Sequence, residues 1–164
     1  MKESNDNFLK VEISGLVRDK RENPIVLLKG EDRDEVLPIW IGHAEALSIE
    51  LRLQGKSFER PLTHDLLKTM IESLGASVVK VAVTDLKDNT FFAKIYLSRD
   101  NEVFAIDARP SDSIALAVRT DAPIYVSEKV FESHKRALQE SEDASDSTDE
   151  ALRKYLRDLD PGEF

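Results

Sequence analysis

Strand-like and helix-like stretches alternate from Phe8 to Asp107, with short runs of turn residues between them, and no other feature limits the possible folds as strongly. Apolar residues recur at every second position in the strand-like stretches and at every third or fourth position in the helix-like ones. At 164 residues the chain is long enough to bury a core without disulfides or metals. We therefore expect an α/β (α+β) fold, in which about four helices pack on a mixed, largely antiparallel sheet.

The turn sequences Lys87-Asp88-Asn89 and Arg99-Asp100-Asn101 separate three strand-like runs and predict an antiparallel meander. No polar residue interrupts 114–118, so the helix around it should be buried nearly all round. We expect strands at residues 11–17, 25–28, 36–41, 79–83, 91–97, 103–108 and 123–126, and helices at 42–54, 63–74, 111–119 and 129–140. Apolar stripes on the first two helices contain Ala44, Leu47 and Leu51, and Leu66, Leu67, Met70, Ile71 and Leu74.

Charge divides the chain into three parts. Residues 1–138 hold 23 acidic and 20 basic residues, a net charge of −3, and are expected to form the folded α/β domain. Residues 139–164 hold 9 acidic and 3 basic residues, a net charge of −6. We interpret 139–150 as an acidic flexible linker and 151–164 as a short C-terminal helix or tail. The linker is a spacer in the simpler interpretation; in the other, the tail mimics nucleic-acid charge and covers the site.

Several function classes are excluded or disfavoured. The chain has no cysteine, which excludes a disulfide framework, a thiolate zinc site and a cysteine nucleophile. No apolar run approaches the roughly 20 residues of a membrane span, and no secretory signal is present, so we expect a cytoplasmic protein without membrane contact. The overall acidity disfavours a non-specific, cationic nucleic-acid wrapper. Walker, nucleophile-elbow and zinc-protease motifs are missing, and no organic cofactor is expected.

Two loops share one pattern, Arg-Pro followed by a hydroxyl residue and an aspartate at a helix start. They are Arg60-Pro61-Leu62-Thr63-His64-Asp65 and Arg109-Pro110-Ser111-Asp112-Ser113. In one interpretation Thr63 and Ser111 cap the helices and the aspartates complement the helix dipole. Capping leaves the arginines unexplained, because a cation opposes that dipole. Arg60 and Arg109 therefore either pair with carboxylates or, with Thr63 and Ser111, bind a phosphate.

Four side chains are candidate catalytic residues: His64, Asp65, Asp112 and Glu45. His64 lies in the first turn of its helix, where a neutral imidazole can act as a general base. Asp107 and Asp112 flank Arg109 and could hold a divalent cation, Mg²⁺ or Mn²⁺, suited to phosphodiester hydrolysis. The alternative is that these carboxylates form an ion-pair network with the arginine.

Three motifs, in this order and spacing, resemble the bifunctional nuclease domain family over about residues 9–135. They are Leu37-Pro38-Ile39-Trp40-Ile41-Gly42 with Glu45-Ala46, the Arg60–Asp65 segment, and Ile106-Asp107-Ala108-Arg109-Pro110-Ser111-Asp112-Ser113-Ile114-Ala115. The resemblance implies an α/β domain of unusual topology, nuclease activity on RNA and DNA as in plant members, and homo-oligomers as in bacterial ones. It implies no settled catalytic residue set.

Two functions follow as hypotheses. The first is a nuclease that hydrolyses RNA or DNA with help from a divalent metal, its substrate phosphate held by Arg60 and Arg109. The second is a non-catalytic, oligomeric module that binds an anion or a partner protein. We expect a homodimer, for whose interface Trp40, Phe131 and one of the adjacent Phe91 and Phe92 are candidates, although core packing is the alternative use for them.

Overall fold

The computed structural model describes residues 6–144, and this part of the chain forms a seven-stranded mixed sheet with four helices. The expected α+β fold is thereby confirmed. Its last helix extends to Ala144, past the predicted end at residue 140. The rest of the predicted linker and the predicted terminal helix, 145–164, lie outside the described residues. The elements are β1 (Phe8–Arg18), β2 (Pro24–Gly30), β3 (Val36–Trp40), α1 (His43–Leu53), α2 (Thr63–Ser73), β4 (Ser77–Lys87), β5 (Thr90–Arg99), β6 (Glu102–Ala108), α3 (Pro110–Thr120), β7 (Ile124–Ser127) and α4 (Glu128–Ala144).

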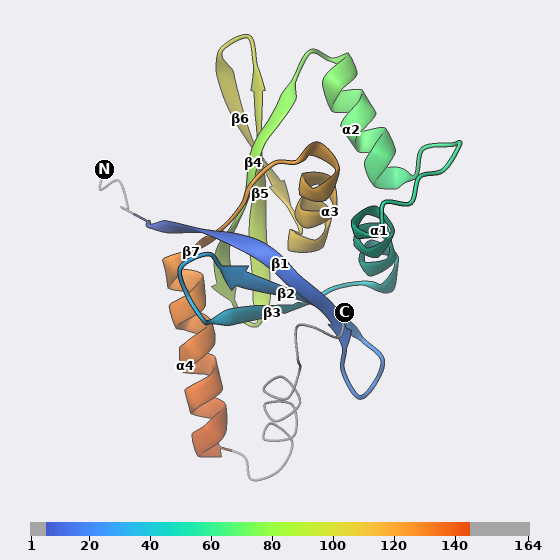
Figure 1. The fold of residues 1–164 in the computed structure, drawn as a ribbon. Coiled ribbons are helices and arrows are strands. Elements are labelled where there is room, and N and C mark those ends of the chain that lie inside the picture. The colour runs from blue at the N-terminus through green and yellow to red at the C-terminus, as the bar shows by residue number, and fades with distance from the viewer. Residues whose placement is uncertain (1–5, 145–164) are drawn as a thin grey trace.

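The sheet has the strand order β3-β2-β1-β7-β4-β5-β6. All neighbouring pairs are antiparallel except β4 and β7. The four-residue strand β7 joins the N-terminal β1–β3 to the β4–β6 meander, pairing Ile124 with both Val11 and Val81. Strand twist turns the two halves across each other, so that β1–β3 cross the direction of β4–β6 (Figure 1).

Both predicted meander turns are present, and their backbone explains the sequence. Asp88 and Asn89 have φ of 50° and 61°, and Asp100 and Asn101 have φ of 51° and 64°. Two consecutive residues with positive φ match the twist of a two-residue hairpin, and Asp and Asn tolerate that conformation better than other non-glycine residues.

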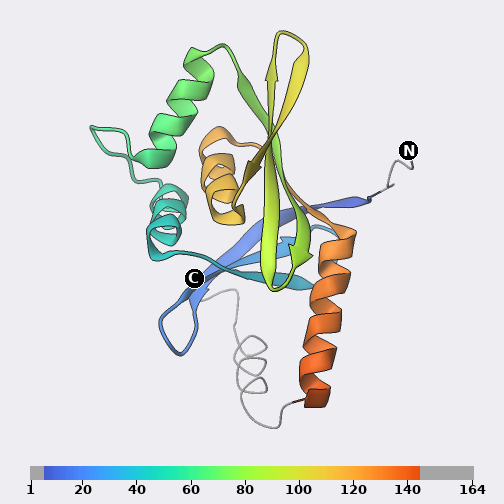
Figure 2. The same cartoon turned by 180° about the vertical axis from the view of Figure 1, so that it is seen from behind.

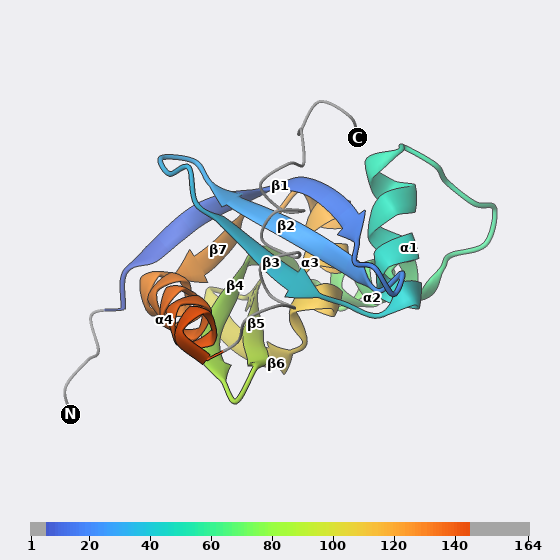
Figure 3. The ribbon, with the colours of Figure 1, turned by 90° about the horizontal axis from the view of Figure 1, so that it is seen from below.

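Helix α3 is the centre of the core. As predicted, it is buried on nearly every side, and Ile114, Ala115 and Leu116 have no exposed surface. It lies between the β4–β6 half of the sheet and the helices α1 and α2 (Figures 1 and 2). Helix α4 lies away from α1, at the other end of the molecule (Figure 3). Within residues 6–144, no helix is long and apolar enough to cross a membrane.

The two apolar helix stripes do not go fully into the core. On α1 the core contacts come from Ala46 and Ile49, whereas Leu47 is 54% exposed. On α2, Leu67 and Ile71 pack against the core, but Leu66, Met70 and Leu74 are exposed. The stripe residues that miss the core therefore lie on the surface of α1 and α2.

The expected helix caps are wrong. The N-cap residues are Leu62 and Arg109, so Thr63 and Ser111 already lie inside their helices, and neither helix has a cap hydrogen bond from an N-cap side chain. Instead, the Asp65 carboxylate accepts a hydrogen bond from the Leu62 backbone N–H at 3.0 Å. Proline explains the shift at α3, since Pro110 takes the first helical position and moves the cap back to Arg109.

Candidate functional site

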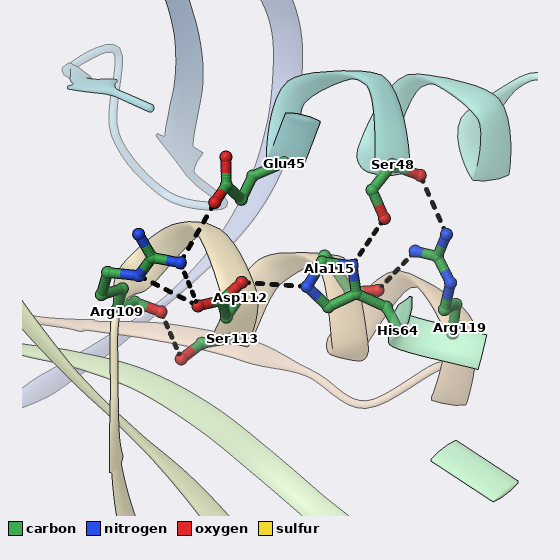
Figure 4. A network of polar contacts seen from close by, with 8 residues as sticks. All are labelled: Glu45, Ser48, His64, Arg109, Asp112, Ser113, Ala115 and Arg119. Atoms are coloured by element: carbon green, nitrogen blue, oxygen red, sulfur yellow. Dashed lines mark hydrogen bonds and ion pairs between the residues drawn. The ribbon is translucent and has the colours of Figure 1, made fainter. Parts of the chain in front are cut away.

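Three helices bring five polar side chains into one connected network (Figure 4). Glu45 and Ser48 come from α1, His64 from the first turn of α2, and Arg109 and Asp112 from the start of α3. The three helices meet because α1 and α2 both pack on α3. The two Arg-Pro loops are thus joined at their helix starts, through residues 48 positions apart in the sequence, His64 and Asp112.

At one end of the network Arg109 bridges two carboxylates. Its Nε and one Nη donate to Oδ2 of Asp112 at 3.1 and 3.0 Å, and the same Nη donates to Oε1 of Glu45 at 3.1 Å. The hydrogen bond to Asp112 and the charges of both acids raise the pKa of Arg109. Its side chain is nevertheless 70% exposed, so this permanent cation faces solvent at a helix start.

At the other end His64 lies between a serine and a carboxylate. Its Nε2 is 3.0 Å from Oδ1 of Asp112, and its Nδ1 is 2.7 Å from Oγ of Ser48. Ser48 and His64 are 9% and 7% exposed. A carboxylate only accepts hydrogen bonds, so a neutral His64 carries its proton on Nε2 and accepts the Ser48 hydroxyl proton at Nδ1. Asp112 therefore fixes both the orientation and the tautomer of the ring.

Asp65, a predicted catalytic residue, makes a different set of contacts. Its Oδ1 accepts a hydrogen bond from Nε of Arg119 at 2.8 Å. Burial by itself would raise the Asp65 pKa, but the Leu62 N–H and the Arg119 guanidinium outweigh burial and hold the pKa below its usual value. Arg119 is almost fully buried and also donates to the carbonyl oxygens of Ser48 and Ala115, at 3.1 and 2.8 Å. This pair fastens α1, α2 and α3 together directly behind the network.

A cavity of about 260 Å³ opens beside the network. All five network side chains line it, together with Thr63 and the apolar stripe of α1, Ala44, Leu47 and Leu51. A second cavity of about 460 Å³ shares Leu51 and Leu62 with the first, so the two adjoin. This second cavity is lined by both charges and by one aromatic side chain, Phe58; the basic residues are Arg52, Lys56, Lys68 and Arg119, and the acidic ones Glu59, Asp65 and Glu72.

Besides Asp65 and Thr63, three sequence candidates lie outside the network. Arg60 is exposed in the loop before α2, and in residues 6–144 its side chain has no hydrogen bond or ion pair. Asp107 is exposed on β6, again without a side-chain partner in that part of the chain. Ser111 is 6% exposed inside α3. Of the two Arg-Pro arginines, the structure therefore connects only Arg109 to His64, through Asp112.

Asp112, one of the two carboxylates predicted to hold a divalent metal ion, is paired with other side chains. Within 6–144, no three or more His, Asp or Glu side chains group in an arrangement that could hold a metal ion. Both oxygens of Asp112 already accept hydrogen bonds, and Arg109 lies between that carboxylate and Glu45. These carboxylates are therefore arranged to hold the Arg109 guanidinium and do not fit a metal ion.

Sequence reasoning missed Ser48 and Arg119. Neither stands in a recognisable motif, since one is a single serine in an amphipathic helix and the other a basic residue in a last helical turn, a common position for arginine. One signal was present: Ser48 follows Glu45 by three residues, which puts both on the same face of α1.

The fold and the network together define an α+β domain with a polar, cavity-lining site at converging helix starts. The bifunctional nuclease domain model matches residues 26–139. The chain belongs to this family. Uncharacterized proteins from two strains of Mycobacterium tuberculosis are each 36% identical to it over 162 residues, covering 94% of this chain and 97% of theirs.

Plant relatives carry a functional name. Bifunctional nuclease 1 of Arabidopsis thaliana is 31% identical over 116 residues, and bifunctional nuclease 1 of Oryza sativa subsp. japonica is 28% identical over 118 residues. These matches cover 68% and 70% of this chain but only 36% of each plant protein. The similarity therefore covers most of this chain but only part of each plant protein.

Proposed function

We propose that this chain is a nuclease that hydrolyses phosphodiester bonds of nucleic acid in the cavity between α1, α2 and α3. The observation that carries the proposal is the continuous network from Ser48 through His64 and Asp112 to Arg109, lining that cavity. Such a network joins a proton acceptor to a permanent cation, which are the two groups that phosphoryl transfer needs most. The family's plant nucleases support the choice of substrate.

Arg109 binds the scissile phosphate. Its Nε and one Nη are engaged with Asp112 and Glu45, while in the described part of the chain the other Nη has no hydrogen bond (Figure 4), and the side chain as a whole is 70% exposed. The two carboxylates hold the guanidinium in place, so little side-chain freedom is lost when a phosphate arrives. Positive charge at this point stabilises the extra negative charge of a pentacoordinate phosphorus.

His64 accepts the proton of the attacking hydroxyl. The ring is ready for this because Asp112 already occupies Nε2 and leaves Nδ1 as the acceptor. Asp112 also stabilises the imidazolium that forms, while its other oxygen holds Arg109. The Asp112 carboxylate therefore orients both the base, His64, and the phosphate-binding residue, Arg109.

The adjoining cavity accommodates the neighbouring nucleotide. Phe58 is 54% exposed in this cavity, so a base of the nucleic acid can stack on its ring. Lys56 and Lys68 line the same cavity and would contact the phosphate of that neighbouring nucleotide. We expect Phe58→Ala to raise KM several-fold with kcat little changed, because the contact is made equally before and during the reaction.

A cleavage assay tests the proposal. The purified chain is incubated with end-labelled single-stranded RNA and DNA, with EDTA, Mg²⁺ or Mn²⁺. We expect cleavage that falls about 100-fold in kcat/KM for both Arg109→Ala and His64→Asn, the order of effect of losing one charged or proton-transfer group. Arg21→Ala, an exposed arginine in the β1–β2 turn, is the matched control and should retain full activity.

Three outcomes are decisive. Cleavage undiminished in both variants would refute the site. No cleavage by the parent chain under any of the ionic conditions would refute the nuclease proposal and favour the binding module. Cleavage that EDTA abolishes, with Arg109→Ala still active, would restore the sequence prediction of metal assistance and require an ion elsewhere in the chain.

We further propose that the chain is a homodimer. Val103, Phe104 and Ile106 are exposed on β6, the edge strand of the meander, and the stripe Leu66, Met70 and Leu74 is exposed on α2 at the same end of the molecule (Figures 1 and 2). Exposed apolar residues next to an unpaired edge strand are typical of an interface. We expect β6 of one copy to pair with β6 of a second copy about a two-fold axis.

Light scattering after gel filtration tests the dimer. We expect about twice the chain mass of 18.5 kDa for the parent protein and the single mass for Ile106→Asp. Leu53→Asp is the control, because Leu53 is as exposed as Ile106 but lies on α1. A parent protein that runs as a monomer at about 100 μM, above the Kd of a stable dimer, would contradict the proposal.

A further inference from the structure

Ser48 differs from three other helix hydroxyls, Thr69, Ser113 and Thr120. Thr69, Ser113 and Thr120 each donate a hydrogen bond to the backbone carbonyl four residues earlier, at 3.0 Å, as hydroxyls inside helices commonly do. Ser48 instead reaches out of α1 and is 2.7 Å from Nδ1 of His64 on α2. Its hydroxyl is thus free of its own helix and held by a base.

The network sets the direction of the Ser48 proton. Asp112 accepts from Nε2 of His64, so the lone pair of Nδ1 points at Ser48 and the hydroxyl donates to it. A serine that donates to an imidazole, itself oriented by a carboxylate, is the constellation of a serine nucleophile, here with the two ring nitrogens exchanged. That constellation is recognised by geometry and not by sequence order.

A phosphate diester bound by Arg109 would lie in the cavity that Ser48 and His64 also line. Ser48, His64 and Arg109 all line the 260 Å³ cavity, and Asp112 is hydrogen-bonded to both the base and the cation. A phosphate diester bound by Arg109 therefore enters the cavity onto which Ser48 opens. Arg119 fixes the nucleophile from behind, because it donates to the Ser48 carbonyl oxygen at 3.1 Å and holds α1 against α3.

We propose that Ser48 is the nucleophile of this site and that cleavage runs through a covalent phosphoseryl intermediate, an inference that rests on the proposed nuclease function. In the first step Oγ of Ser48 bonds to phosphorus, its proton passes to Nδ1 of His64, and the bond from phosphorus to one sugar oxygen breaks. That oxygen leaves with the proton from Nδ1. In the second step His64 takes a proton from water, the hydroxide oxygen bonds to phosphorus, and the Ser48 oxygen leaves with that proton.

Double displacement makes predictions that single displacement does not. Attack by serine and then by water inverts phosphorus twice, so a chiral phosphorothioate diester cleaved in ¹⁸O-water should give a product with retained configuration. A direct attack by water, with Ser48 serving only to orient His64, would give inversion.

The experiment combines kinetics with covalent labelling. Ser48→Ala and the control Ser127→Ala, a fully buried serine on β7 outside the network, are compared with the parent chain for folding by circular dichroism and for kcat on single-stranded RNA. These three proteins and His64→Asn are also treated with a fluorophosphonate, which phosphonylates nucleophilic serines, and the site of modification is mapped by mass spectrometry. We expect Ser48→Ala to lose at least 100-fold in kcat, and the label to sit on Ser48 and to disappear in His64→Asn.

The outcomes separate the two proposals. Activity of Ser48→Ala within about threefold of the parent, or inversion at phosphorus, overturns the nucleophile and leaves the nuclease intact. A parent chain that cleaves nothing overturns the nuclease, and labelling alone then decides: Ser48 modified in a His64-dependent way supports a reactive serine, and an unmodified Ser48 overturns it. A merely structural Ser48 would lower stability in Ser48→Ala without ever carrying the label.

Discussion

Arg119 ties together the three helices that carry the site, and replacing it with methionine should destabilise the fold measurably. Arg119→Met keeps most of the buried aliphatic volume but removes three hydrogen bonds, one to Asp65 at 2.8 Å and two to carbonyl oxygens at 2.8 and 3.1 Å. A charged hydrogen bond contributes about 1.5–3 kcal/mol, and since Asp65 is 39% exposed the lower end applies. Each carbonyl bond adds about 0.5 kcal/mol, the low end for a net hydrogen bond.

The expected loss in the free energy of unfolding is therefore about 2–3 kcal/mol. Urea denaturation followed by circular dichroism should show a midpoint about 1–2 M lower, with an unchanged slope. The control is Arg52→Met, because Arg52 also donates to a carbonyl of α3, Val118, but is exposed, and its loss should cost less than about 1 kcal/mol. In an Asp65→Asn background Arg119→Met should cost about 1.5 kcal/mol less than in the parent, the share of the ion pair. Equal midpoints for Arg119→Met and Arg52→Met would refute the reasoning.

Three further predictions concern positions outside this pair. Gly42→Ala should leave the free energy of unfolding nearly unchanged, since φ at this position is −72°. The added Cβ would lie 2.1 Å from Oε2 of Glu45 and would force the Glu45 side chain away from Arg109. We therefore expect kcat/KM to fall several-fold in Gly42→Ala and to be unaffected by it in a Glu45→Ala background. Burial lowers the pKa of His134 below 6.5. Near pH 6 the folded chain therefore binds fewer protons at this histidine than the unfolded chain, so the free energy of unfolding decreases as the pH falls below 6.5. The melting temperature of His134→Gln should accordingly decline less than that of the parent between pH 7.5 and 5.5, and parallel declines would contradict it. Asn101→Val should cost about 1–2 kcal/mol because φ there is 64°, whereas Asn101→Gly should be nearly neutral, a contrast that thermal unfolding can measure.

Local pattern was sufficient for the elements but not for their arrangement. The hairpin turns at Asp100-Asn101 and the buried run 114–118 are properties of a few adjacent residues, and both are found where the sequence predicts them. The place of β7 depends on Ile124 pairing with Val11, more than a hundred residues away, and no periodicity contains that information.

The site shows the same division. The helix starts at His64 and Asp112 were recognisable from Arg-Pro motifs, yet the sequence could not say that Arg109 would join them while Arg60 would not. Arg109 is followed three residues later by Asp112, which it contacts, whereas the aspartate after Arg60 is five residues on, and only the packing of α1 on α3 brings Glu45 to Arg109. The role of Ser48 could not be predicted from the sequence, because its hydrogen-bond partner His64 lies on another helix.

The position of β7 has a consequence for how the chain is made. Three strands at the beginning and three in the middle have no direct ladder between them, and the strand that bridges them is only four residues long and lies near the end of the described chain. During synthesis, β1–β3 and β4–β6 therefore cannot join into one sheet until residue 127 has left the ribosome. Until then the edges of β1 and β4 that pair with β7 are unpaired. A chain truncated before Ile124 lacks the bridging strand and cannot close the sheet, so we expect it to need chaperone protection.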